Sequence, residues 1–226
     1  MSRDNAALAL LVAVLLVFWD AALLWPFRVL IVLFHEAGHA MMALCTGGTV
    51  LSITLSPAEG GATLTQGGSI FLILNAGYLG SLAAGLALLR LTRKDAGQRG
   101  LSVVLGGGLL GAAFTWLDGF AFFYGLAAAL GFGLLGLKAS HRTVRWVLRA
   151  IGTLSVLYAL FDIRDDVLFG AGRSDAVMLA ERTGIPALIW GVGWLAISAV
   201  VVWGSRRWWA TGVSPKSQGS APNGSA

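Results

Sequence analysis

Residues 27–45 read FRVLIVLFHEAGHAMMALC, and this stretch decides the fold. It is nearly long enough to cross the hydrocarbon core of a bilayer as a helix, which takes about 20 apolar residues. Three ionisable side chains, His35, Glu36 and His39, stand close together in its second half. Ionisable side chains are costly inside a membrane helix, so such a cluster marks a candidate functional site.

The composition of the whole chain is that of a membrane protein. Of its 226 residues, 57% are hydrophobic and only 12% are charged, against roughly 25% charged residues in soluble domains. A soluble domain of this size cannot bury so much apolar surface in one core. The same numbers exclude a disordered chain, and a single cysteine, Cys45, excludes a disulfide scaffold and a cysteine-based zinc site. Because the basic residues lie between long apolar runs, we expect no nucleic-acid partner.

The apolar runs predict an all-α polytopic membrane protein with about seven transmembrane helices. The first run starts like a signal peptide, but Asp20 and Trp25-Pro26 make a poor cleavage region, so we keep it as a helix. We expect residues 1–204 to form a single domain and the Ser/Gly/Pro-rich tail 205–226 to be disordered. The expected helices are 6–25, 27–45, 69–91, two within 101–137, 147–161 and 186–204.

A different pattern fills residues 49–67, between the second and third expected helices. Val50–Leu55 alternates apolar with polar residues, 56–61 is rich in turn formers, and the alternation resumes at 63–65. This pattern predicts a short β-hairpin. We expect Glu59, in the turn, to be solvated.

Lysines and arginines gather in two loops, around 90–99 and 138–149, and again at Arg206 and Arg207. Such residues mark the cytoplasmic side of a membrane. We therefore expect a multi-pass protein with a cytoplasmic C-terminus, and with the hairpin and the acidic segment 162–181 on the outside. The cytoplasmic (plasma) membrane is the default location.

His35 and His39 are one helical turn apart, so their imidazoles project from the same face of the helix. Two imidazole nitrogens in this arrangement can bind one metal ion at about 2.0–2.1 Å each, as in the HExxH motif of zinc hydrolases. Glu36 lies beside the pair, where a carboxylate can act as general base on a metal-activated water. The alternative is a structural cluster of hydrogen-bonded side chains without a metal. The desolvation of three ionisable groups in an apolar span favours the metal, Zn²⁺.

Several further motifs follow in order along the chain. They are Gly47-Gly48, Ser56-Pro57-Ala58-Glu59-Gly60-Gly61-Ala62-Thr63, Asn75-Ala76-Gly77-Tyr78-Leu79-Gly80-Ser81, Asp162-Ile163-Arg164-Asp165-Asp166, Ser174-Asp175-Ala176, and Ile185-Pro186 with Trp190. Together with the HExxH motif, this set resembles the site-2 protease-like intramembrane metalloproteases, and more closely their peptidase M50B-like branch, over roughly residues 31–195. The resemblance implies a zinc ion held by His35, His39 and an aspartate, with Glu36 activating water. It also implies a membrane-embedded protein substrate that is cut within or near the bilayer.

Three aspartates are candidates for the third ligand, since a catalytic zinc usually has three protein ligands and one open position for water. Asp175 is favoured because its Ser-Asp-Ala element resembles the M50B-like branch, although Ser174 also looks like a helix N-cap. Asp118 is the only charge in 101–137 and resembles the aspartate motif of classical site-2 proteases, but the Asn and Pro that usually precede that motif are absent. Asp162, at the end of a span, is the third candidate.

The predicted hairpin has a candidate role in substrate binding. A substrate helix must unwind before its peptide bond can be attacked, and a free strand edge can take up the exposed N–H and C=O groups. The alternating segment with Val50, Ile53 and Leu55 is the candidate edge. Asn75 can bond to substrate backbone or pack between helices. The alternative is a surface hairpin that binds no substrate.

Two other functions stand as alternatives to a zinc-dependent intramembrane endopeptidase. Because the third ligand is open, the chain also fits a non-catalytic metal-binding membrane adaptor or a pseudoprotease. Seven spans with intramembrane acids also fit a small transporter, but we find no inverted repeat and no pair of broken helices in the sequence.

Overall fold

The computed structural model describes residues 3–93, 97–168 and 174–210. Within these ranges the chain forms α-helices, one short 3-10 helix and a two-stranded antiparallel sheet. The elements in chain order are α1 (Arg3–Val17), η1 (Ala22–Leu24), α2 (Trp25–Cys45), β1 (Thr49–Leu55), β2 (Gly61–Gln66), α3 (Ile70–Leu91), α4 (Gln98–Thr115), α5 (Phe120–Lys138), α6 (His141–Leu168), α7 (Asp175–Thr183) and α8 (Ala187–Ala210).

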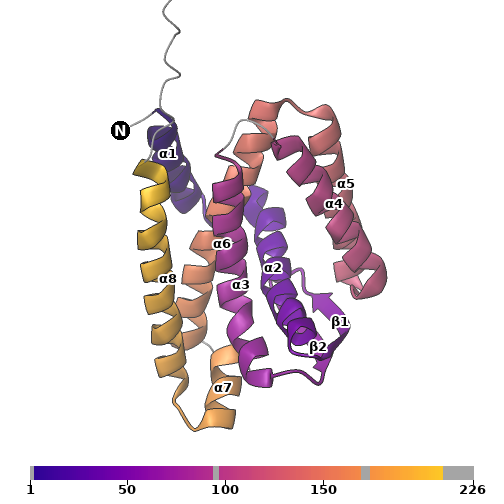
Figure 1. Ribbon diagram of the computed structural model, residues 1–226, viewed down its shortest axis with the longest axis vertical. Coiled ribbons are helices and arrows are strands. Elements are labelled where there is room, and N and C mark those ends of the chain that lie inside the picture. The colour runs from indigo at the N-terminus through magenta and orange to yellow at the C-terminus, as the bar shows by residue number, and fades with distance from the viewer. Residues whose placement is uncertain (1–2, 94–96, 169–173, 211–226) are drawn as a thin grey trace, which may run out of the picture.

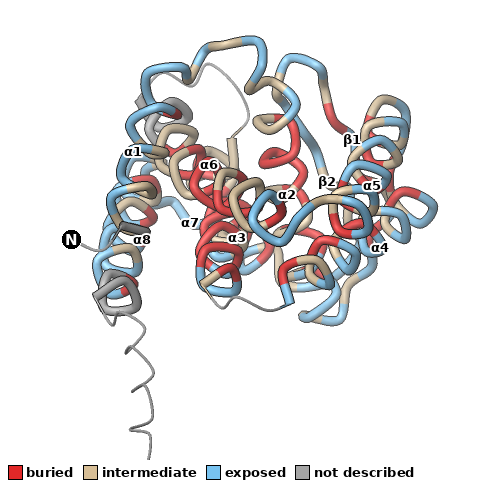
Figure 2. The backbone as a smooth tube through the Cα atoms, turned by 90° about the horizontal axis from the view of Figure 1, so that it is seen from above, coloured by how far each residue is buried: buried red, intermediate tan, exposed pale blue. Residues whose placement is uncertain are grey.

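Helices α2, α3 and α6 form the centre of the molecule. Figure 1 shows the α4–α5 pair on one side of this centre and α8 with α1 on the other. Seen from above, buried residues concentrate where α2, α3 and α6 face one another, while the outer helices are largely exposed (Figure 2). Large apolar side chains such as Phe114, Phe123 and Val200 are among the exposed ones. An apolar exterior of this kind fits contact with lipid.

Glycine allows α3 to contact both of its neighbours closely. A Cβ added at Gly38 of α2 would lie 2.3 Å from the carbonyl oxygen of Ala76 in α3. One added at Gly80 of α3 would lie 2.9 Å from Cα of Gly38. On the other side of α3, a Cβ at Gly85 would lie 2.7 Å from the carbonyl oxygen of Gly152 in α6. Small residues therefore bring the three central backbones together, as in many membrane helix bundles.

The β-hairpin lies alongside α2. Thr63 of β2 contacts Glu36, in the middle of α2. At the hairpin turn, the Pro57 carbonyl accepts a hydrogen bond of 2.8 Å from Nε1 of Trp25, the first residue of α2. The chain thus leaves the end of α2, runs back to its start and returns. The side of the membrane on which the hairpin lies stays a prediction, and non-helical backbone beside a membrane span requires a covering of protein or a water-filled cavity.

The outer edge of β1 is already paired. The N–H of Ile53 donates to the carbonyl of Trp116 (2.7 Å), and its carbonyl accepts from the N–H of Asp118 (3.0 Å), in the turn between α4 and α5. The side chains of Val50, Ile53 and Leu55 are buried in the core. This corrects the expectation of a free edge at Ile53, because a distant segment of the chain pairs with β1 at that residue. In the described part of the chain, β2 has no strand partner other than β1.

The chain is an integral, multi-pass membrane protein. Among the described residues, five helical segments are long and apolar enough to cross a bilayer, namely η1 with α2, α3, α5, α6 and α8. Helix α1 has 15 residues, about 22 Å at 1.5 Å per residue, against a hydrocarbon core of about 30 Å. The expected count of seven spans stays a prediction.

The other expected helices are present with shifted ends, but the first, expected over 6–25, ends at Val17 and is followed by a turn and the 3-10 helix η1. The long apolar stretch 101–137 divides into α4 and α5 at a turn over 116–119. Helix α7, in the acidic segment, was not among the expected spans, although Ser174 looks like a helix N-cap in the sequence and is the N-cap of α7. Helix α8 continues to Ala210, beyond the expected end at Gly204, and the rest of the expected disordered tail, 211–226, lies outside the described residues.

Candidate metal centre

His35 and His39 lie one turn apart on α2 and point to the same side. Their Nε2 atoms are 3.0 Å apart, and the rings meet edge to face, with centroids 4.7 Å apart. The pairing follows from the helix period, which places residues i and i+4 on one face.

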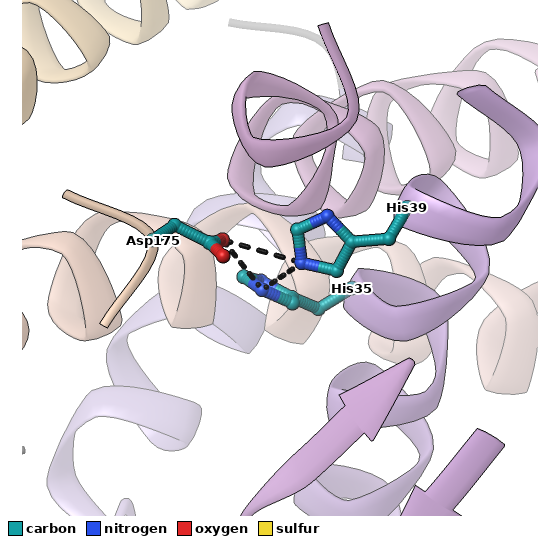
Figure 3. A group of neighbouring side chains, drawn as sticks. All are labelled: His35, His39 and Asp175. Carbon is teal, nitrogen blue, oxygen red and sulfur yellow. Dashed lines mark hydrogen bonds and ion pairs between the residues drawn. The ribbon is translucent and has the colours of Figure 1, made fainter. Parts of the chain in front are cut away.

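The carboxylate of Asp175, far from the two histidines in the sequence, lies next to them in the structure. Asp175 is the first residue of α7, and the Ser174 hydroxyl caps that helix by accepting a hydrogen bond from the N–H of Val177. The cap fixes the start of α7, and Asp175 then points toward α2. Its Oδ2 lies 3.2 Å from Nε2 of His35 and 3.2 Å from Nε2 of His39. Figure 3 shows the three side chains converging on one another.

The three donor atoms have the spacing of a metal site. In a tetrahedral zinc site with ligands at about 2.0–2.1 Å, ligand atoms lie roughly 3.3–3.4 Å apart, close to the 3.0–3.2 Å separations here. Among the described residues, the buried Oδ2 of Asp175 has no hydrogen-bond partner that satisfies it. An aspartate binds a metal as the ionised carboxylate and a histidine binds it through a ring nitrogen without a proton. Two histidines and an aspartate therefore fit a divalent cation such as zinc.

Neighbouring groups orient both imidazoles. Nδ1 of His39 lies 2.7 Å from the Ile73 carbonyl, and because a carbonyl only accepts, Nδ1 carries the proton and Nε2 is left with a lone pair for a metal. The His35 ring packs edge-on against Tyr78, with centroids 4.7 Å apart. A Cβ added at Gly77 of α3 would lie 2.4 Å from Nε2 of His35 and 2.6 Å from Cε1 of His39. Glycine at position 77 therefore leaves the space in which the two rings lie.

Glu36 is buried beside the histidines, with 5% of its surface exposed. Its Oε2 accepts a hydrogen bond of 2.7 Å from Oγ1 of Thr63 in β2. The same glutamate and the three candidate ligands line one cavity of about 420 Å³. A general base and a metal centre are thus brought to a common space.

A sequence profile described as Peptidase M50B-like matches residues 7–205. The chain belongs to the Peptidase M50B-like family. This confirms the family expected from the motifs, and the match extends beyond the expected 31–195 at both ends. The chain matches no curated protein and no solved structure.

In this Peptidase M50B-like protein, the structure distinguishes between the three aspartates that are candidates for the third metal ligand. Only Asp175 joins the two histidines in a group of potential metal ligands among the described residues. Asp162, in α6, lines the same cavity without belonging to that group. Asp118 is exposed in the turn between α4 and α5, where its N–H bonds to β1.

The other predicted substrate contacts lie away from the metal centre. The Asn75 side chain donates to the Phe71 carbonyl (2.7 Å), and its Oδ1 accepts from Nε1 of Trp194 in α8 (2.8 Å). Asn75 thus links α3 to α8, and the cavity lining does not include it. Two residues of the site were not predicted from the sequence, namely Gly61 and Thr63, which contact Glu36. The alternation in β2 was the only sequence signal for them, because it places both residues on one face of the strand.

Proposed function

We propose that this protein is a zinc-dependent intramembrane endopeptidase that hydrolyses a peptide bond in a membrane-embedded protein substrate. The single observation that carries the proposal is the convergence of His35, His39 and Asp175 in the cavity that Glu36 also lines. The family membership supports a membrane metallopeptidase.

Each residue has a separate role in the proposed reaction. His35, His39 and Asp175 would hold the metal, which as a Lewis acid polarises the peptide carbonyl and lowers the pKa of water. Glu36 takes a proton from the attacking water, whose oxygen bonds to the carbonyl carbon. As the C–N bond breaks, Glu36 returns this proton to the leaving nitrogen. The products are a carboxyl and an amino terminus, so no other co-reactant is needed.

The outer edge of β2 is the proposed substrate-binding edge. Ile53 directs its N–H and C=O away from β2, and it lies opposite Thr63 in the hairpin. Because Ile53 forms its backbone hydrogen bonds on the side away from β2, Ile53 and Thr63 are a non-hydrogen-bonded pair of the antiparallel hairpin. The N–H and C=O of Thr63 therefore also point away from β1. By the two-residue alternation of a strand, the same holds for Thr65. An unwound substrate segment can pair with these outward groups, beside the Glu36 carboxylate.

The membrane orientation is proposed from the position of the charges. Arg90 in the last turn of α3 and Lys138 in the last turn of α5 lie at one end of the bundle, together with the C-terminal end of α8 (Figure 1). Helix α7 lies at the opposite end (Figure 1). Basic residues favour the cytoplasmic side, so we infer a cytoplasmic C-terminus and a metal centre nearer the outer side of the plasma membrane.

A cleavage assay with matched variants tests the proposal. The probe is a synthetic single-span peptide with an Asn-Gly pair in its apolar helix and a fluorophore and quencher on either side, reconstituted with the full chain in phosphatidylcholine vesicles. We expect zinc-dependent cleavage by the wild-type protein, at least 100-fold slower cleavage by Glu36→Gln with its zinc retained, and normal cleavage by His141→Ala, which alters the exposed third histidine. Equal rates for Glu36→Gln and wild type would contradict hydrolysis at this site and favour a non-catalytic metal-binding protein.

A further inference from the structure

Thr63 holds the carboxylate of Glu36 from the strand that faces it. Its Oγ1 lies 2.7 Å from Oε2 of Glu36 and 3.0 Å from the backbone carbonyl of the same residue. A hydroxyl has one proton and donates to one of these acceptors at a time, and an ionised carboxylate is the stronger acceptor. Glu36 is buried, so its carboxylate depends more on protein hydrogen-bond donors such as Thr63 than on bulk water.

Gly61 provides the space for the same carboxylate. A Cβ added at Gly61 would lie 2.5 Å from Oε1 and 2.8 Å from Cγ of Glu36. Gly61 and Thr63 are two residues apart in β2, so their side-chain positions lie on the same face of the strand. One residue leaves room for the carboxylate and the other donates a hydrogen bond to it.

We propose that Thr63 is a positioning residue for Glu36, and that Gly61 and Thr63 together fix the orientation in which the carboxylate acts as general base. The proposal rests on the proposed function and deepens it, because the backbone of Thr63 also lies on the edge assigned to the substrate. A single residue then sets the distance between the bound peptide strand and the group that activates water. In enzymes, a shift of about 1 Å in such a group costs on the order of 100-fold in rate.

Two pairs of variants separate positioning from general damage to the hairpin. Thr63→Val removes the hydroxyl at nearly constant volume, and Thr63→Ser keeps it. Thr54→Val is the control, since the Thr54 hydroxyl is exposed and forms a long hydrogen bond with the Ala62 carbonyl (3.4 Å). Gly61→Ala places a methyl group against Glu36, while Gly107→Ala in α4 is its control, since a Cβ there meets nothing within 4 Å.

Three measurements are made on each full-length variant in vesicles or detergent: kcat and KM with the peptide probe above, zinc content, and the midpoint of thermal unfolding. We expect Thr63→Val and Gly61→Ala to lower kcat about 10- to 100-fold with zinc content retained and KM within about twofold. Thr63→Ser should restore most of kcat, and both controls should match wild type. A kcat for Thr63→Val equal to that of Thr54→Val would overturn the proposal.

A thermal double-mutant cycle tests the contact without catalysis. Thr63→Val should lower the unfolding midpoint by about 2–4 °C in the wild-type background and by clearly less in the Glu36→Ala background, where the carboxylate is already gone. Additive shifts would overturn the proposal. A wild-type protein that cleaves nothing contradicts the proposed function alone, and the thermal cycle then decides whether Thr63 holds Glu36.

Discussion

Arg28 in α2 forms a two-bond ion pair with Glu59 at the turn of the β-hairpin. Nε and one terminal nitrogen of Arg28 each donate to a different carboxylate oxygen of Glu59, both at 2.8 Å. The backbone of Glu59 has a φ of +65°, in the left-handed region that residues other than glycine rarely adopt. The turn is therefore held at the start of α2, while Thr63 holds β2 at the middle of the same helix. Two fixed points set the register of the hairpin along α2.

Breaking this ion pair should loosen the hairpin. We expect Glu59→Ala to lower the free energy of unfolding by about 1–3 kcal/mol, because the Arg28 guanidinium, only 12% exposed, loses its carboxylate partner and keeps the carbonyls of Trp19 and Ala21. Amide hydrogen exchange should speed up over residues 49–66 and stay unchanged in α8. Glu181→Gln, at an exposed carboxylate of α7, is the control. Unchanged exchange in the hairpin of Glu59→Ala would show that Arg28 does not hold it.

Gly77→Ala should disrupt the metal centre from the neighbouring helix. The added Cβ would lie 2.4 Å from Nε2 of His35, so the imidazoles must move apart. We expect zinc affinity to fall at least 10-fold, measured by competition with a chromophoric chelator. Gly107→Ala in α4, where a Cβ meets nothing within 4 Å, is the matched control and should bind zinc as the wild type does. Equal affinities for the two variants would contradict the close packing of α3 on the histidines.

Asp175→Ala should weaken zinc binding more than changes at the other two candidate aspartates. It removes one of three protein ligands, whereas Asp162→Asn and Asp118→Asn leave the donor group intact. We expect zinc content after dialysis to fall below half for Asp175→Ala and to stay near one ion per chain for the other two. Retention of zinc by Asp175→Ala with loss in Asp118→Asn would mean that the turn between α4 and α5 supplies the third ligand.

A proline scan tests which strand edge binds substrate. Thr65→Pro removes an N–H that points away from β1, so the hairpin should survive while KM for the peptide probe rises at least threefold. Leu64→Pro removes an N–H that points toward β1, so it should lower the unfolding midpoint by breaking the hairpin itself. Wild-type KM in Thr65→Pro would argue against pairing of substrate with β2.

The helical part of the fold and half of the site follow from local sequence. Apolar runs long enough to cross a bilayer predict helices. The i, i+4 spacing of His35 and His39 places both on one face of their helix, independently of the tertiary packing. The hairpin follows equally from alternation and turn residues over 49–67. In all of these cases the interacting residues lie within one element or in adjacent ones.

Contacts between distant segments could not be predicted in the same way. Local sequence did not distinguish Asp175, Asp118 and Asp162 as the third metal ligand, and only the family resemblance favoured Asp175. The packing of α7 against α3 decides which aspartate lies beside the two histidines. The free edge was assigned to β1 because nothing in its own sequence shows that the segment 116–118 pairs with Ile53. Glu59 looked like a solvated turn residue for the same reason, since its partner Arg28 lies in another element.

The most direct test of the central claim is an X-ray absorption spectrum of the purified full-length protein at the zinc edge. The account predicts about one zinc ion per chain with a shell of nitrogen and oxygen atoms at about 2.0–2.2 Å, the outer-ring scattering of two imidazoles and no sulfur. It also predicts that this signal is lost in His35→Ala and His39→Ala and is unchanged in His141→Ala. A protein purified without zinc that takes none up, or a zinc shell unaffected by the loss of His35 and His39, would contradict the account.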